Sequence, residues 1–277
     1  MNERVMVTIE GGVADVRLTR ADKMNAIDDA MFDALIQTGE RLKTEAGVRA
    51  VVLSGEGRAF CAGLDVDGFQ SLAAGAPSGA LDTGNATRER TPGGAHRVQQ
   101  AVMVWREVPV PVIVALHGVA FGGGFQLALG ADLRFVAPDA KLSVLEIKWG
   151  LVPDMGGIVL LRGLVRDDVA RELTWSGRTF TGEEAGRLGI ATRVVVNPLE
   201  DALAFAHEIA GKSPHAIRAG KRLLNLAVDG DQHGILLEEA REQVALIGSP
   251  NQMEAVMANL EKRQPKFAEV ATGGPAP

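Results

Sequence analysis

The sequence predicts an α/β domain with mainly parallel strands, followed by a helical C-terminal region. Short apolar runs that are typical of buried strands alternate with helical segments over the first part of the chain. From Thr181 onward, helix-start signals and amphipathic spacing dominate instead. With 277 residues, of which 46% are apolar, the chain is long enough to bury one large core.

The first predicted elements are a hairpin, a helix and a buried strand. Residues 5–9 and 13–18 are β-type runs on either side of Gly11-Gly12, a pair that is typical of a tight turn. Residues 28–46 place apolar side chains on one broad helical face. The continuous apolar run AVVLS at 50–54 predicts a strand that is covered on both faces.

The middle of the chain combines a long loop with further short elements. Residues 65–94 are rich in Gly, Ala, Ser, Thr and Pro, which predicts a mobile surface loop. Apolar runs and helical spacing then predict the elements that follow. They are a helix at 95–107, a strand at 110–116, a helix at 124–129, and strands at 133–136 and 141–144.

The last third carries three helix-start signals. They are the pair Thr181 and Glu184, the dipeptide Ser213-Pro214, and Ser249-Pro250 with Gln252. We therefore divide the chain into an α/β core at 1–198 that is expected to hold the functional site, a helical region at 199–266, and a disordered tail at 267–277. The amphipathic helices of the helical region need a surface to cover, either their own core or a neighbouring subunit.

Charge and cysteine content limit the class of protein. The net charge of −6 and the pI near 5.5 argue against a nucleic acid as the main partner, since that would require a basic surface. Cys61 is the single cysteine, so no internal disulfide is possible. The N-terminus lacks the pattern of a signal peptide, and no apolar run approaches the roughly 20 residues that span a bilayer. We expect a cytoplasmic protein without a membrane partner.

Two glycine-containing segments are candidates for binding an anion. In the first, SGEGRAFCAGLD, a buried strand runs into a turn of small residues that allows a ligand close to the backbone. In the second, Gly122, Gly123 and Gly124 lie between a buried strand and a helix, where free N–H groups can stabilise a developing oxyanion. Taken separately, the first is also typical of an ordinary turn and the second of close strand–helix packing.

Together these segments resemble the crotonase, or enoyl-CoA hydratase/isomerase, family. The resemblance is carried by FCAGLD at 60–65 and HGVAFGGGFQLALGAD at 117–132, and it extends from KMNAI to EKRQPKF near the C-terminus. It implies a fold of repeated ββα turns with a C-terminal helical oligomerisation region. It also implies that the N–H groups of Leu64 and Gly123 bind the thioester oxygen. Such a donor contributes on the order of 10²- to 10³-fold in rate.

A third segment, LEIKWGLVPDMGG, carries two carboxyl groups. Glu146 aligns with the proton-transferring glutamate of the family, although by local sequence alone it equally fits a surface glutamate beside Lys148. A carboxyl group in an apolar site has a raised pKa and acts as acid or base near neutral pH. Asp154 fits a helix N-cap, but the dienoyl-CoA isomerase branch of the family has a second catalytic aspartate at this offset. Trp149 lies between the two and is expected to contact substrate.

The main departure from the family pattern is Gln126, because hydratases of the family have a glutamate there. Glutamine can hold a water molecule but cannot accept its proton at neutral pH. We therefore prefer an enoyl-CoA isomerase, in which Glu146 alone moves a proton, over an enoyl-CoA hydratase. A third alternative is a subunit that binds acyl-CoA without catalysis.

The resemblance also implies partners and a CoA site. The CoA-binding set that we expect is Lys23, Ala62, Asp65 and Lys266, with the lysines near the CoA phosphates. We expect an acyl-CoA thioester as substrate and a homotrimer or dimer of trimers. No metal or redox cofactor is expected, since CoA arrives as part of the substrate.

Overall fold

A six-stranded sheet forms the centre of the protein, whose computed structural model describes residues 4–65 and 89–270. The strand order is β1-β2-β3-β4-β6-β9, and only the β1–β2 pair is antiparallel. The predicted hairpin and the mainly parallel sheet are therefore confirmed. The strands are β1 (Val5–Glu10), β2 (Val13–Leu18), β3 (Ala50–Gly55), β4 (Val112–Leu116), β6 (Leu133–Val136) and β9 (Arg193–Val194).

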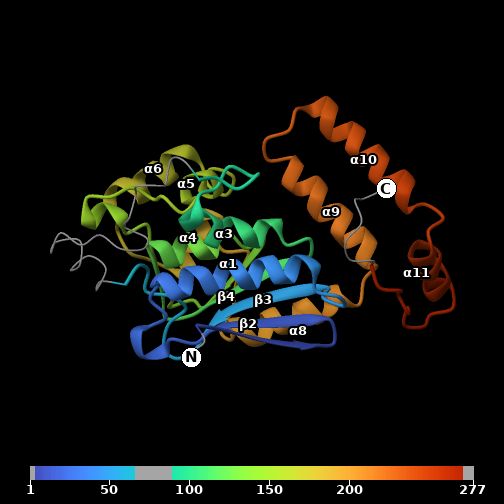
Figure 1. Ribbon diagram of the computed structural model, residues 1–277, viewed down its shortest axis with the longest axis horizontal. Helices are drawn as coiled ribbons and strands as arrows, with labels where there is room; N and C mark the ends of the chain where they lie inside the picture. Colours follow the sequence, from blue (N-terminus) through green and yellow to red (C-terminus); the bar gives the residue numbers. More distant parts are fainter. Residues whose placement is uncertain (1–3, 66–88, 271–277) are drawn as a thin grey trace.

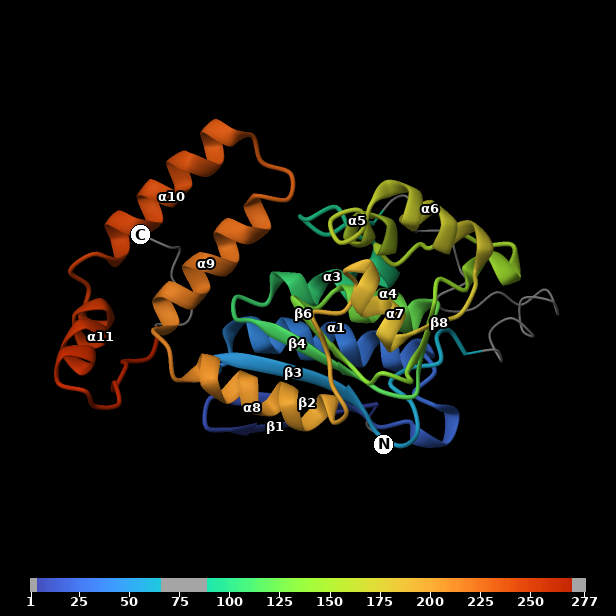
Figure 2. The ribbon, with the colours of Figure 1, turned by 180° about the vertical axis from the view of Figure 1, so that it is seen from behind.

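Helices cover both faces of this sheet, as Figure 2 shows. On one face lie α1 (Asp29–Thr44), α3 (Arg97–Glu107) and α4 (Gly123–Leu129), and on the other lies α8 (Pro198–Ala210). Successive side chains of a strand point to opposite faces. In β3, accordingly, Val51 and Leu53 join the core on the α1 side while Val52 packs against α8. This double coverage explains the continuous apolar runs of the central strands.

A small second sheet supports the segment from which α4 begins. Its order is β5-β7-β8, with β5 (Val119–Phe121) parallel to β7 (Lys141–Ser143) and β8 (Phe180–Thr181) antiparallel to β7. Within the described residues, five further short helical elements lie between strands along the chain. They are η1 (Ala21–Lys23), η4 (Glu146–Trp149), α5 (Gly157–Leu161), α6 (Asp167–Ser176) and α7 (Gly182–Leu188).

Three C-terminal helices extend away from the sheet (Figure 1). They are α9 (Pro214–Leu226), α10 (Gln232–Leu246) and α11 (Pro250–Leu260). Lys221 attaches α9 to the core, since its buried Nζ donates to the Val110 carbonyl (2.9 Å) and the Trp105 carbonyl (3.3 Å) and pairs with Asp132 Oδ2 at 2.6 Å. The three helices leave large apolar side chains exposed. Among them are Leu224, Leu236, Val244, Met253 and Leu260.

The helix-start signals of the last third mark real N-caps at two of the three sites. The Thr181 and Ser249 side chains accept from the N–H groups of Glu184 and Gln252, whereas Ser213 makes no capping hydrogen bond. The domain limits remain a prediction. Within the predicted helical region 199–266, however, α8 packs on the sheet, and only the later helices leave it.

Two predicted mobile segments fall largely outside the described residues. Of the loop at 65–94, the structure leaves out 66–88, and of the tail at 267–277 it leaves out 271–277. In the described start of that tail, Arg49 donates to the Phe267 carbonyl (3.2 Å) and to Glu269 (2.7 Å). Within residues 4–65 and 89–270, no helix is both long and apolar enough to cross a membrane.

Candidate active site

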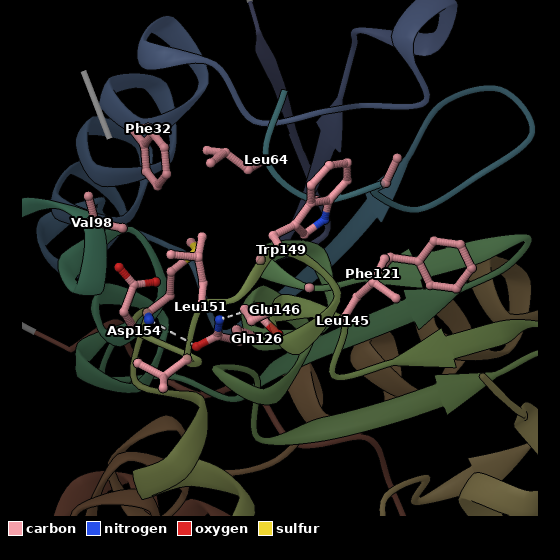
Figure 3. A pocket seen from close by; sticks show the side chains of 16 residues that line it. Phe32, Leu64, Val98, Phe121, Gln126, Leu145, Glu146, Trp149, Leu151 and Asp154 are labelled. Atoms are coloured by element: carbon pink, nitrogen blue, oxygen red, sulfur yellow. Dashed lines mark hydrogen bonds between the residues drawn. The ribbon is translucent and has the colours of Figure 1, made fainter. Parts of the chain in front are cut away.

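One pocket of about 230 Å³ gathers most of the predicted site residues (Figure 3). Its walls come from α1, the turn after β3, the β5–α4 junction, α3, and the segment that begins with η4. The lining residues are Phe32, Ala62, Gly63, Leu64, Val98, Phe121, Gly122, Gly123, Gln126, Leu145, Glu146, Trp149, Leu151, Val152, Asp154 and Met155.

The two glycine-containing segments touch each other on the pocket wall. Gly63 has φ +94°, and a Cβ there would lie 2.5 Å from the Phe121 carbonyl oxygen and 3.6 Å from the Gly123 nitrogen. The Ile27 N–H donates to the Gly63 carbonyl (2.8 Å), and the Asp65 N–H donates to the Ile27 carbonyl (3.0 Å). These two bonds fix the backbone on either side of Leu64.

The N–H groups of Leu64 and Gly123 make no hydrogen bond within the described part of the chain. Both belong to residues that line the pocket. The glycines also serve packing. A Cβ at Gly123 would lie 2.8 Å from Met155 Sδ, and one at Gly124 would lie 2.4 Å from the Cys61 carbonyl oxygen. The same segment therefore meets a packing requirement and carries a backbone N–H group without a partner among the described residues.

Glu146 contributes a buried carboxyl group to the pocket. The residue is 9% exposed, its Oε1 accepts from Gln126 Nε2 at 2.6 Å, and its buried Oε2 has no hydrogen-bonding partner among the described residues. Burial raises the pKa of Glu146, and the Gln126 hydrogen bond opposes this rise. The absent side chain of Gly122 leaves room for the carboxyl group, since a Cβ there would lie 3.3 Å from Oε1.

Gln126 is hydrogen-bonded on both ends of its amide group. Its Oε1 accepts from the N–H groups of Met155 and Gly157, each at 2.9 Å, while its Nε2 donates to Glu146. We assigned Gln126 to positioning substrate or water. In the structure its oxygen accepts from the backbone of the segment that follows Asp154, and the positioning role stays a prediction. No local sequence pattern indicates these two bonds.

Asp154 lies at the open side of the same pocket. Figure 3 shows Gln126 between Asp154 and Glu146 in this view, in agreement with the hydrogen bond that the N–H of Met155, the residue after Asp154, donates to Gln126 Oε1. Partial burial of the carboxyl group raises the pKa of Asp154, and a positive charge on His96 would oppose this rise. His96 caps α3, where its Nδ1 accepts from the Val98 N–H at 3.2 Å. We did not anticipate His96 as a neighbour of the site.

The structure also defines the surroundings of Trp149 and Cys61. Trp149 lines the pocket and is 47% exposed, with Lys148 Nζ 5.6 Å from its ring centroid. Cys61 is fully buried, and its Sγ donates to the Asn25 carbonyl. Burial raises the pKa of the Cys61 thiol to about 12, so it is not a nucleophile at neutral pH.

The expected CoA-binding residues are only partly brought together. Ala62 lines the pocket, and its N–H donates to the Met24 carbonyl at 2.9 Å. Asp65 pairs with Arg20 at 2.5 Å, which gives its side chain a structural partner. Lys23 ends η1 and Lys266 follows α11, and neither lines this pocket. Within the described residues, no group of three or more His, Cys, Asp or Glu side chains is arranged to hold a metal.

Comparison with known proteins agrees with this fold. The family model "Enoyl-CoA hydratase/isomerase" matches residues 8–270. A protein named as a probable enoyl-CoA hydratase from Mycobacterium leprae is 34% identical over 264 residues, which cover 94% of this chain and 98% of that protein. The peroxisomal Δ(3,5)-Δ(2,4)-dienoyl-CoA isomerase of Arabidopsis thaliana is 29% identical, with 97% of each chain covered.

A solved structure gives the same result. The enoyl-CoA hydratase of Bacillus anthracis superposes with a TM-score of 0.84 at 28% identity and covers 95% of this chain and 98% of its own. The protein is thus an α/β enzyme of the crotonase type. It belongs to the enoyl-CoA hydratase/isomerase family, and the resemblance noted in the sequence is confirmed.

Proposed function

We propose that the protein is an isomerase that shifts the double bond of an enoyl-CoA thioester by moving a proton with Glu146. The observation that carries the proposal is the neighbourhood of Glu146. A buried carboxyl oxygen without a partner shares one pocket with two unpaired backbone N–H groups, while an amide occupies the place of a second carboxylate.

Each part of this arrangement has a role in the reaction. Removal of a proton from the carbon beside a thioester places negative charge on the carbonyl oxygen, which the N–H groups of Leu64 and Gly123 are available to stabilise. Glu146, whose pKa is raised by burial, takes the proton from one carbon and returns it to another. Trp149 and apolar side chains such as Leu151 line the pocket beside the reacting acyl chain.

Asp154 is the candidate for a second proton carrier. It lines the same pocket, and its pKa is also raised. Two carboxyl groups allow removal at one position of a longer conjugated system and delivery at another. Relatives named as Δ(3,5)-Δ(2,4)-dienoyl-CoA isomerases, from Arabidopsis thaliana and from Mus musculus, make a dienoyl-CoA a substrate to include in the assay.

Hydration is the second candidate, because several relatives are named as enoyl-CoA hydratases. Hydration requires a group that takes a proton from water, and Gln126 cannot do so at neutral pH. Its oxygen also already accepts two backbone N–H groups. A subunit that only binds acyl-CoA is the third candidate.

The assay supplies a 3-enoyl-CoA and a 2-enoyl-CoA separately and follows the absorbance of the conjugated thioester. We expect that absorbance to appear from the 3-enoyl-CoA and to require Glu146, so that Glu146→Gln is inactive. Loss of absorbance from the 2-enoyl-CoA without formation from the 3-enoyl-CoA assigns hydration instead. Tight binding of CoA thioesters without turnover assigns the non-catalytic role.

CoA enters as part of the substrate, and we propose no metal or redox cofactor. Lys23, Ala62, Asp65 and Lys266 remain the proposed CoA-binding set. The exposed apolar side chains on α9, α10 and α11 support a homotrimer or a dimer of trimers, because a surface of this kind favours burial against another subunit. Light scattering coupled to size-exclusion chromatography tests this, and a monomer at micromolar concentration contradicts it.

A further inference from the structure

The amide group of Gln126 has only one orientation that satisfies its neighbours. Its Oε1 accepts from two backbone N–H groups, those of Met155 and Gly157, both at 2.9 Å. Reversal of the amide places its NH₂ group against these two donors and leaves both without an acceptor. Gln126 is 1% exposed, so water does not replace the lost bonds. The Nε2 atom must therefore face Glu146.

That orientation determines which oxygen of Glu146 carries the proton. Because Nε2 donates to Oε1 at 2.6 Å, a hydrogen on Oε1 would make that oxygen a weaker acceptor for this bond, whereas a hydrogen on Oε2 leaves Oε1 as the carbonyl acceptor. The protonated form of Glu146 therefore has its hydrogen on Oε2. Oε2 is also the oxygen without a partner among the described residues.

The same amide joins three segments that are far apart in the sequence. It is part of α4, which begins at Gly123, it bonds to Glu146 in η4, and it holds the backbone directly after Asp154. A Cβ at Gly157 would lie 2.7 Å from Gln126 Oε1, so a glycine at this position allows the close approach of the amide to the backbone.

We infer that Gln126 is a positioning residue that sets the spacing of the Glu146 and Asp154 segments and restricts the mobile proton of Glu146 to Oε2. The inference rests on the proposed function for its role in turnover. The protonation of the Glu146 carboxyl group, however, is measurable without turnover. Among the charged groups of the pocket, Asp154 raises the pKa of Glu146. A positive charge on His96 would lower the pKa of Asp154 in turn.

Two variants distinguish the role of the acceptor oxygen of Gln126 from that of its donor nitrogen. Gln126→Glu keeps an oxygen for the two backbone N–H groups but places a second carboxylate against Glu146 Oε1. Gln126→Met removes both the acceptor and the donor at similar volume. Gln100→Met is the matched control, because Gln100 is 4% exposed, lies on α3 and does not line the pocket.

The direct readout is an infrared pH titration of the Glu146 carboxyl band, identified by its loss in Glu146→Gln. In Gln126→Met the donor that favours the ionised form is absent, so we expect ionisation at higher pH than in the wild type. In Gln126→Glu two adjacent carboxylates share one proton, and we expect a larger shift in the same direction. Gln100→Met should titrate as the wild type does.

Turnover gives the second readout. A misplacement of about 1 Å in a catalytic group costs on the order of 10²-fold, so we expect kcat for 3-enoyl-CoA to fall by that order in Gln126→Met, with a smaller change in KM. The acid limb of the pH profile should move together with the infrared titration. If the wild type only hydrates, the proposed function fails, and the titration still tests Gln126.

A folded Gln126→Met protein that titrates and turns over as the wild type does would overturn the inference. If that variant does not fold, Gln126→Glu decides, because it retains an acceptor for both backbone N–H groups. An unchanged Glu146 titration in Gln126→Glu would then overturn the inference.

Discussion

Gly63→Ala is the perturbation that tests the proposed oxyanion-binding backbone with the least chemical change. The new methyl group would lie 2.5 Å from the Phe121 carbonyl oxygen and 3.4 Å from the carbonyl carbon. Both are backbone atoms, so no flexible side chain can move aside. An ordinary contact requires a displacement of roughly 1 Å between the Leu64 and Gly123 segments.

The expected cost follows from this displacement. Each oxyanion donor contributes on the order of 10²- to 10³-fold, and a 1 Å error removes on the order of 10²-fold. We therefore expect kcat for 3-enoyl-CoA to fall by on the order of 10²-fold. A non-glycine residue at φ +94° also costs about 1–3 kcal/mol of stability. Thermal melting followed by circular dichroism should show a decrease of several degrees.

Gly47→Ala separates strain from displacement. Gly47 also has a positive φ, +76°, but a Cβ there meets nothing within 4 Å, and the residue lies between α1 and β3. We expect it to lose stability by a similar amount and to keep its activity. The reasoning is refuted if Gly63→Ala folds and retains the wild-type kcat, or if Gly47→Ala loses activity to the same extent.

The remaining predictions concern buried or pocket-lining groups. Burial raises the pKa of Glu146 in the folded protein, so ionisation of its carboxyl group destabilises the fold as pH rises above the ordinary pKa of a glutamate. Glu146→Gln should therefore raise the melting temperature at about pH 8 but not at about pH 4. An equal increase at both pH values would contradict this. Asp154→Asn should lower turnover of a dienoyl-CoA by on the order of 10²-fold and spare a mono-enoyl-CoA, as steady-state kinetics on both substrates would test. Lys221→Met should cost about 3–5 kcal/mol in urea unfolding, because it leaves Asp132 without its cation; a loss below about 1 kcal/mol would refute this. Cys61 should react with a thiol reagent only after denaturation, and rapid reaction in the native protein would contradict its burial.

The sheet could be predicted from sequence because its central strands are buried on both faces. Val51, Val52 and Leu53 are all fully buried, so the run in the sequence has no polar interruption. The two-residue strands β8 and β9 could not be predicted, since they depend on pairing with distant strands rather than on a local pattern. The interior of β6 also contains Arg134, a buried cation that bonds to the Ile190 and Ala131 carbonyls, and no apolar pattern indicates such a residue.

The site was predictable in its residues and less so in its contacts. Glycines before Leu64 and around Gly123, together with the family resemblance, identified the backbone that the structure brings together. The bonds of Gln126 to the Met155 and Gly157 N–H groups join residues 29 and 31 positions apart, and nothing local to Gln126 encodes them. For this reason the sequence led us to assign Gln126 to positioning substrate or water, but it could not predict that its oxygen accepts from this backbone.

A structure with a bound, unreactive CoA thioester tests the central claim most directly. We predict that the thioester oxygen lies roughly 2.7–3.1 Å from the nitrogen atoms of both Leu64 and Gly123, with Glu146 Oε2 facing the carbon beside the carbonyl group. A thioester oxygen bound away from these two N–H groups, or Glu146 turned away from the acyl chain, would contradict the account.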